Sequence, residues 1–344
     1  MLCFSPTGQV TGKRLVEGLE KRGHQVQLFS KSRYLADSIE ENHTEWTGKQ
    51  FRETDALIYI GACGIAVRSI APFLVSKKTD PAVLVTDECG NYVISLLSGH
   101  LGGANELTEE AAEVLHGIPV ITTATDLHGT FAVDVFAKKN DCAIYPMTAA
   151  KEVSAALLAK ERVGFYSEFP WEGNLPAGLE FCDKEKETER PRVGIAVSIH
   201  SEEDPFEVTV HVVPHVVSLG MGCRKGKEAE EIRTAAENCL KECGIRRQAL
   251  ETLTSIDLKK EEKGLLSLAE AWKIPFVTFS EEELKKVPGA FTASEFVRNI
   301  TGVENVCERS AVMASGHGTL IQKKISTEGV TAALAIRDRR ICFE

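Results

Sequence analysis

A histidine and two carboxylates stand close together in one glycine-rich stretch of this chain. Asp87 and Glu88 directly follow the apolar run 82–86, and the string SGHLGGAN at 98–105 places His100 shortly after them. The apolar run has the length and β-branched content of a buried strand, so the carboxylates are expected at its carboxyl end, where open α/β sheets place their ligands. A titratable imidazole beside carboxylates and free backbone amides could carry out acid–base chemistry.

The glycines give this stretch unusual backbone freedom. Gly99, Gly102 and Gly103 fall within five residues and allow positive φ and close approach of the backbone to a ligand. Asn105 stands where it could cap a helix over 106–115. The alternative interpretation is a plain glycine-rich turn with a capping Asn and an incidental His.

Two further strand-to-helix turns combine glycines with basic residues. Gly64 and Arg68 lie in the segment 61–68, where helix amides could meet an anion and the guanidinium could grip a carboxylate, although a surface Arg is the commoner fate. The strand from Val216 runs into the glycines of 220–226, where Arg224 and Lys225 at the mouth of the turn favour an anion site.

Glu308 and Arg309 are adjacent and open to two interpretations. They could pair with each other at a helix start, or they could face a cleft and supply an acid–base carboxylate and an anion clamp. The opening segment 7–14 is similar to a phosphate loop. It is one residue short of GxxxxGK and has Arg14 where Ser or Thr should hold magnesium, so a plain turn is favoured there.

Composition limits the classes of protein that fit. A chain of 344 residues with 43% apolar and 26% charged residues can form two or three domains. No apolar run approaches a membrane span and the start lacks a signal peptide, so we expect a cytoplasmic protein without a membrane partner. The net charge of −10 argues against general nucleic-acid binding but leaves room for a local basic pocket.

Short apolar strands alternate with amphipathic helices in the first and last parts of the chain. In the first part we expect strands at 2–5, 26–29, 56–60, 82–86 and 120–123. This rhythm predicts an α/β fold: an N-terminal doubly wound parallel-sheet domain (1–145), a small middle domain or linker (146–213) and a C-terminal α/β domain (214–344). In the last part we expect a helix at 227–243, strands at 253–256 and 275–279, and a closing hairpin of 319–325 with 330–336.

The sequence resembles the cobalamin biosynthesis protein G family, the cobalt-precorrin-5A hydrolases of the anaerobic vitamin B12 route. The resemblance rests on LLSGHLGGAN at 96–105 and LGMGCRKG at 219–226, with further agreement at 261–265, 308–311 and 331–335. It spans nearly the whole chain in the same order. The first string is specific, whereas GMGCR also occurs in proteins that carry only the last domain.

The resemblance implies an activity and roles for the candidate residues. The family opens the ring-A lactone of cobalt-precorrin-5A and releases acetaldehyde, giving cobalt-precorrin-5B. His100 would then be the base, oriented by Asp87 or Glu88, with Asn105 as a polar anchor. Residues expected to bind the substrate are Gly64, Arg68, Ser98, Gly99, Gly102, Gly103, Gly222, Arg224, Lys225, Glu308 and Arg309, with the amides around Gly102 and Gly103 as oxyanion donors.

The resemblance implies no cofactor and no protein metal, because the cobalt arrives with the substrate. Other enzymes of the cobalamin route and a second copy of this chain stay open as partners. A non-catalytic tetrapyrrole carrier is the alternative function. It would need the same domains and the same basic clamps, but it would not need His100.

Overall fold

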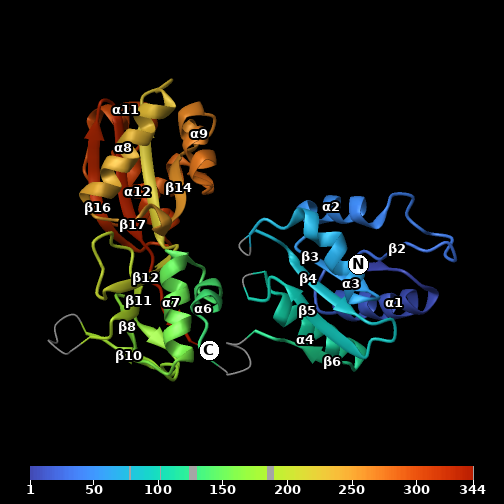
Figure 1. Cartoon of the computed structure of the whole chain (residues 1–344). Helices are drawn as coiled ribbons and strands as arrows, with labels where there is room; N and C mark the ends of the chain where they lie inside the picture. The colour runs from blue at the N-terminus through green and yellow to red at the C-terminus, as the bar shows by residue number, and fades with distance from the viewer. Residues whose placement is uncertain (77–78, 101, 124–129, 184–189, 344) are drawn as a thin grey trace. The chain divides into compact units, whose positions relative to one another are not determined.

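The computed structural model describes residues 1–76, 79–100, 102–123, 130–183 and 190–343 (Figure 1). The chain divides into two compact units, Met1–Val135 and Phe136–Glu344. The first unit contains a sheet of six strands, and the second contains two sheets of five strands each. The predicted α/β class is therefore confirmed.

The sheet of the first unit has six strands in the order β2-β1-β3-β4-β5-β6. Its strands are β1 (Leu2–Cys3), β2 (Phe29–Ser30), β3 (Ala56–Ile60), β4 (Ala82–Thr86), β5 (Tyr92–Leu97) and β6 (Ile118–Val120). The first four are parallel to one another, β5 is antiparallel to β4, and β6 runs parallel to β5. The direction of the chain therefore reverses within the sheet.

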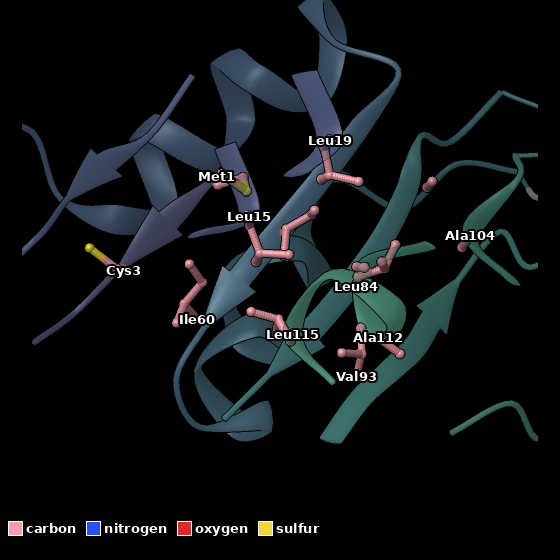
Figure 2. Close-up of a cluster of buried hydrophobic side chains, with 13 residues drawn as sticks. Met1, Cys3, Leu15, Leu19, Ile60, Leu84, Val93, Ala104, Ala112 and Leu115 are labelled. Carbon is pink, nitrogen blue, oxygen red and sulfur yellow. The ribbon is translucent and has the colours of Figure 1, made fainter. Parts of the chain in front are cut away.

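Helices cover both faces of this sheet because its strands alternate apolar side chains between the two faces. Ile58 and Ile60 point into a core with α1 (Pro6–Glu20) and α4 (Ala104–Leu115), part of which is drawn in Figure 2. Leu57 and Tyr59 point into the opposite core with α2 (His43–Glu53) and α3 (Cys63–Ile70). The helix η1 (Ala71–Phe73) also belongs to this unit, whereas α6 (Val133–Lys139) begins in it and continues into the second unit. Two helix layers on one sheet give the doubly wound architecture that the sequence predicted.

The observed elements of the first unit agree with the prediction only in part. The strands β3 and β4 have the predicted bounds, whereas β6 ends where a strand at 120–123 was expected to begin. The helix α2 was not predicted. The prediction also treated 87–105 as one loop-rich stretch, but Tyr92–Leu97 pairs with β4 through an antiparallel hairpin.

The second sheet is built from the middle of the chain in the order β10-β8-β11-β12-β7. Its strands are β7 (Cys142–Tyr145), β8 (Val163–Ser167), β10 (Leu179–Phe181), β11 (Val193–Val197) and β12 (Val208–Pro214), and α7 (Met147–Leu158) packs on them. The short strands β9 (Trp171–Glu172) and β18 (Ile341–Cys342) pair separately. The three-part division of the chain stays a prediction; in the structure β7 pairs with β12, and the chain separates after Val135.

The third sheet has the order β15-β14-β13-β17-β16. Its strands are β13 (Val217–Cys223), β14 (Leu250–Ile256), β15 (Phe276–Phe279), β16 (Thr319–Thr327) and β17 (Val330–Ile336). The helices in this part of the chain are α8 (Ala229–Glu242), η2 (Arg247–Ala249), η3 (Asp257–Lys259), α9 (Lys263–Trp272), α10 (Glu281–Lys286), α11 (Glu295–Thr301) and α12 (Cys307–Ala314). The predicted closing hairpin is confirmed as β16 and β17. A Cβ on Gly220 would lie 1.9 Å from the Cys307 carbonyl oxygen, so this glycine lets α12 lie directly on β13.

No helix in the described ranges is long and apolar enough to cross a bilayer.

Candidate active site

His100 lies in the loop between β5 and α4 and faces a carboxylate. Its Nδ1 is 3.6 Å from Oδ2 of Asp134, and both side chains are only 16% exposed. Asp134 stands in the first turn of α6, where its Oδ1 also accepts the backbone N–H of Val135 at 3.0 Å. Burial by itself would raise the pKa of Asp134, but the nearby His100 ring and the backbone N–H of Val135 outweigh it and hold that pKa below its usual value.

The backbone of the His100 loop is closed by its own hydrogen bonds. The amide of Gly103 donates to the His100 carbonyl at 3.0 Å, and the amides of Ala104 and Asn105 donate to the carbonyls of Ser98 and Gly99. Gly103 therefore does not offer its amide as the predicted oxyanion donor. Leu101 of the same motif lies outside the described residues.

Close packing and side-chain hydrogen bonds also hold the His100 loop in place. A Cβ on Gly99 would lie 2.6 Å from Oδ1 of Asn105, and one on Gly102 would lie 2.7 Å from the Ser98 carbonyl oxygen, so the loop needs both glycines for close packing. Asn105 is buried within α4, where it accepts from Ser95 Oγ at 2.6 Å and donates to Thr123 Oγ1 at 3.2 Å.

Asn105 does not cap α4 as predicted. The N-cap residue is Gly103, with φ of 80°. Ser98 has a positive φ of 58°, and its hydroxyl donates to the carbonyl of Asp80 at 2.9 Å. Both polar side chains therefore anchor the loop that presents His100.

Asp87 and Glu88 do not meet His100. Val83 pairs with Leu97, so the His100 loop starts beside the amino end of β4, whereas the two carboxylates follow the carboxyl end of that strand. At about 3.3 Å per residue, the length of β4 separates them by roughly 15 Å. The reversal at β5 is the physical reason why the predicted pairing fails, and Asp134 is the carboxylate that faces the ring instead.

The two carboxylates have other surroundings. Asp87 accepts the backbone N–H groups of Cys89 at 2.9 Å and Tyr92 at 2.8 Å, together with the side-chain amide of Asn91 at 3.2 Å. It therefore stabilises the turn of the β4–β5 hairpin. The Glu88 side chain is exposed, and its backbone carbonyl accepts from Thr11 Oγ1 at 2.5 Å.

Gly64 and Arg68 stay on α3. Gly64 lies in the first turn of this helix, after the carboxyl end of β3. Because β3 and β4 are parallel, Gly64 and Asp87 lie at the same end of the strands. Arg68 is exposed, and its Nη1 donates to the Gly64 carbonyl at 3.2 Å. The structure does not gather these two residues with His100.

The second unit contains a cleft of about 1210 Å³ at the carboxyl ends of β13 and β14. Its walls come from 222–229, Ile256, Leu258, Lys259, 261–264, Ser267, Ser294, Phe296, Val297, Ile300, Thr301, 305–307, Lys324, Ser326, Gly329 and Thr331. The amino ends of α8, α9 and α12 contribute to these walls, and helix amino ends favour negative charge. Gly222, Arg224 and Lys225 line this cleft, as expected of residues that bind an anionic ligand.

The cleft carries more positive charge than the sequence prediction assigned to it. Within the described ranges, four of its cationic side chains make no ion pair: Arg224, Lys225, Lys263 and Lys324. Lys259 instead pairs with Glu262 at 2.8 Å, and Glu262 also accepts the amide of Gly226. Burial by itself would raise the pKa of Glu262, but these two contacts lower it.

An apolar surface lies inside the same cleft. Leu258, Phe296 and Ile300 line it and are 65%, 64% and 57% exposed. Side chains of this size are normally buried, and an exposed group of them marks a surface that binds something apolar. The cleft therefore offers apolar contact together with cations for acidic substituents.

Glu308 and Arg309 are structural residues outside the cleft walls. Glu308 is fully buried and accepts from the amide and the hydroxyl of Thr292 and from the Lys324 amide, at 2.7–2.8 Å. Arg309 donates to the carbonyls of Leu284 and Val287, at the end of α10. Neither predicted interpretation holds, because the two side chains neither pair with each other nor face the cleft.

Comparison with known proteins gives matches along nearly the whole chain. The cobalamin synthesis G N-terminal model matches residues 45–126, the cobalamin biosynthesis central region matches 131–214, and the cobalamin synthesis G C-terminus matches 217–335. A cobalt-precorrin-5A hydrolase of Salmonella typhimurium is 34% identical over 98% of this chain and 97% of its own length. The chain belongs to the cobalamin synthesis G family.

Two further proteins are similar to this chain. A cobalt-precorrin-5A hydrolase of Priestia megaterium is 35% identical over 92% of this chain and 85% of its own length. The crystal structure of a protein described as a cobalamin biosynthesis protein G homologue from Sulfolobus solfataricus is 22% identical, with a TM-score of 0.40, and the match covers 98% of this chain and 96% of that one. The names of these relatives give no support to the carrier alternative.

Several residues in this family member were missed by sequence reasoning. Asp134 lies in a short helix without a motif, so nothing in the sequence connected it with His100. Lys263 and Lys324 are separated from the Arg224 turn by many residues and reach it only through the fold. No group of three or more His, Cys, Asp and Glu side chains in the described ranges is placed to hold a metal ion.

Proposed function

We propose that this chain is a cobalt-precorrin-5A hydrolase that opens the ring-A lactone and releases acetaldehyde, giving cobalt-precorrin-5B. One observation carries the proposal: relatives with this name align along nearly the whole chain, over all three family regions. The substrate brings the cobalt, and we propose no further cofactor. The cytoplasmic location and the association with other enzymes or with a second copy stay predictions.

The cleft of the second unit is the proposed binding site for the macrocycle. A tetrapyrrole of this pathway is a large flat ring with apolar faces and carboxylates at its periphery. Phe296 and Ile300 can contact a ring face, while Arg224 and Lys225 at the turn can hold carboxylates. The volume of the cleft, about 1210 Å³, exceeds the roughly 300–1,000 Å³ of ordinary small-molecule pockets, as a ligand as large as the macrocycle requires.

His100 is the proposed base. Opening a lactone needs a water that loses a proton as it attacks the carbonyl, and release of acetaldehyde needs the freed hydroxyl to lose its proton while the macrocycle accepts the electron pair of the broken carbon–carbon bond. An imidazole can take each proton near neutral pH. Support comes from its position in the glycine loop and from the carboxylate at Nδ1, which leads us to assign the proton transfers to Nε2.

Incubation with cobalt-precorrin-5A tests the function directly. We expect acetaldehyde, detected by NADH oxidation with alcohol dehydrogenase, in a one-to-one ratio with a macrocycle that has gained water and lost the two-carbon fragment. The His100→Gln variant should bind the macrocycle but release acetaldehyde roughly 10²–10⁴-fold more slowly. Wild-type chain that binds the macrocycle and returns it unchanged would support the carrier function instead.

A further inference from the structure

We infer that Asp134 is a positioning residue for His100. It holds the imidazole with its proton on Nδ1 and stabilises the imidazolium that forms when Nε2 takes a proton. The inference rests on the proposed function, in which His100 is the base. Neither the family models nor the names of the relatives assign a role to Asp134.

The geometry at Nδ1 supports this role. The ring nitrogen and the carboxylate oxygen lie 3.6 Å apart, within ion-pair range, and both side chains are largely withdrawn from water. A charge pair in such surroundings is screened less than one on the surface. A carboxylate at one ring nitrogen selects the tautomer whose lone pair is on the other nitrogen, which is the form a general base needs.

The electrostatics agree with the geometry. The nearby His100 ring, together with the backbone N–H of Val135, lowers the pKa of Asp134 against the effect of burial. The attraction acts on both groups, so the carboxylate stabilises the protonated ring. Asp134 therefore stays ionised when the ring gains its proton.

A purely structural role is the competing explanation. Asp134 lies in the first turn of α6, and its Oδ1 accepts the N–H of Val135 at 3.0 Å. Asn at this position would keep an oxygen for that N–H but would lose the negative charge. Asp134→Asn therefore separates the two explanations better than Asp134→Ala does.

The test compares four forms of the full chain: wild type, Asp134→Asn, His100→Gln and the double variant. For each we would measure kcat and kcat/KM of acetaldehyde release between about pH 5.5 and 9, macrocycle binding by absorbance, and thermal unfolding. Glu110→Gln is the matched control, since Glu110 pairs with His24 at 2.8 Å in the same unit and has no proposed role in the reaction.

We expect Asp134→Asn to lower kcat by about 10–100-fold, in line with the loss of an outer partner of a functional His. Macrocycle binding and the unfolding temperature should stay close to wild type. The acidic limb of the pH profile should move to lower pH, because a ring without the neighbouring anion gives up its proton more readily. In the His100→Gln background the same substitution should have no further effect.

Three outcomes would overturn the inference. The first is an unchanged pH profile with unchanged kcat in Asp134→Asn. The second is an equal loss in the wild-type and His100→Gln backgrounds, which would show that Asp134 acts independently of the ring. The third is a loss of activity that follows a loss of thermal stability. If wild type releases no acetaldehyde, the proposed function itself has failed.

Discussion

At the scale of single residues, hydrogen bonds separate the cationic side chains that hold the fold from those that can hold a ligand. Arg309 directs its guanidinium at two backbone carbonyls and lies over the ring of Phe291 at 4.6 Å. Arg224 lies in the cleft wall and makes no ion pair among the described residues. Sequence alone cannot distinguish them, because each basic residue sits near the start of a helix.

Arg224→Ala is expected to weaken macrocycle binding more than it slows turnover. A cation that grips a peripheral carboxylate interacts about equally with the ground and transition states, so its loss raises KM by about tenfold and leaves kcat within about twofold. Steady-state acetaldehyde release gives both parameters. Arg233→Ala removes an exposed arginine of α8 that pairs with Glu230, and it should change neither. A large fall in kcat at constant KM would place Arg224 at the reacting centre.

Glu308→Ala is expected to destabilise the fold without a specific effect on chemistry. The substitution removes the acceptor of two partly buried hydrogen bonds, from the amides of Thr292 and Lys324. Hydrogen bonds to charged groups contribute about 1.5–3 kcal/mol each, so the loss should be roughly 3–5 kcal/mol in the free energy of unfolding. Urea denaturation measures it. Glu308→Gln, which keeps one carbonyl acceptor, should lose less; equal stability of all three forms would contradict the structural role.

At the scale of elements, the sequence predicted the central strands well and the chain direction around the site poorly. β3 and β4 have the predicted bounds because each is a short apolar run buried on both faces. β5 was missed because its run leads directly into the glycine loop. Because β5 is antiparallel to β4, the glycine loop lies beside the amino end of β4 and not beside its carboxyl end, where the sequence suggested it.

The C-terminal cleft was anticipated better than the His100 site. Its main turn follows a parallel strand, so the rule that ligands bind at carboxyl ends of strands applies directly to Arg224 and Lys225. The other cations and the apolar residues of α11 come from segments distant in sequence. Contacts of this kind depend on how helices pack on the sheet, which periodicity does not reveal.

Gly220→Ala tests the packing of α12 on β13. The new Cβ would lie 1.9 Å from the Cys307 carbonyl oxygen and 2.9 Å from the amide nitrogen of Ala311, so the helix must shift as a whole. We expect a cost of about 3 kcal/mol in the free energy of unfolding. Gly222→Ala is the matched control, since the atom it approaches, Thr331 Oγ1 at 2.9 Å, belongs to a side chain that can rotate. Equal losses from both substitutions would argue against rigid contact of helix and strand.

At the scale of the whole molecule, an acidic chain contains a locally basic cleft. The net charge is −10, yet three helix amino ends and four cations that pair with no carboxylate among the described residues meet in the cleft of the second unit. Screening lengths of about 8 Å at physiological ionic strength keep this local field distinct from the charge of the rest of the chain. An acidic protein can therefore bind an anionic macrocycle.

The same charge distribution predicts loss of stability in acid. Asp134 in the first unit and Glu262 in the second are both largely buried, and each has its pKa lowered by a cationic neighbour. A carboxyl whose pKa is lower in the folded state contributes stability above its unfolded pKa of about 4, and that contribution is lost as pH falls through the folded value.

Urea unfolding followed from pH 7 down to about 3 should therefore show a falling free energy of unfolding. Glu262→Gln should reduce the dependence on pH, whereas Glu172→Gln, which alters an exposed pair with Arg340, should leave it unchanged. If Glu262→Gln and wild type lose stability in parallel over this range, the carboxylate of Glu262 contributes nothing to acid sensitivity and the stabilising role of its pair with Lys259 must be abandoned.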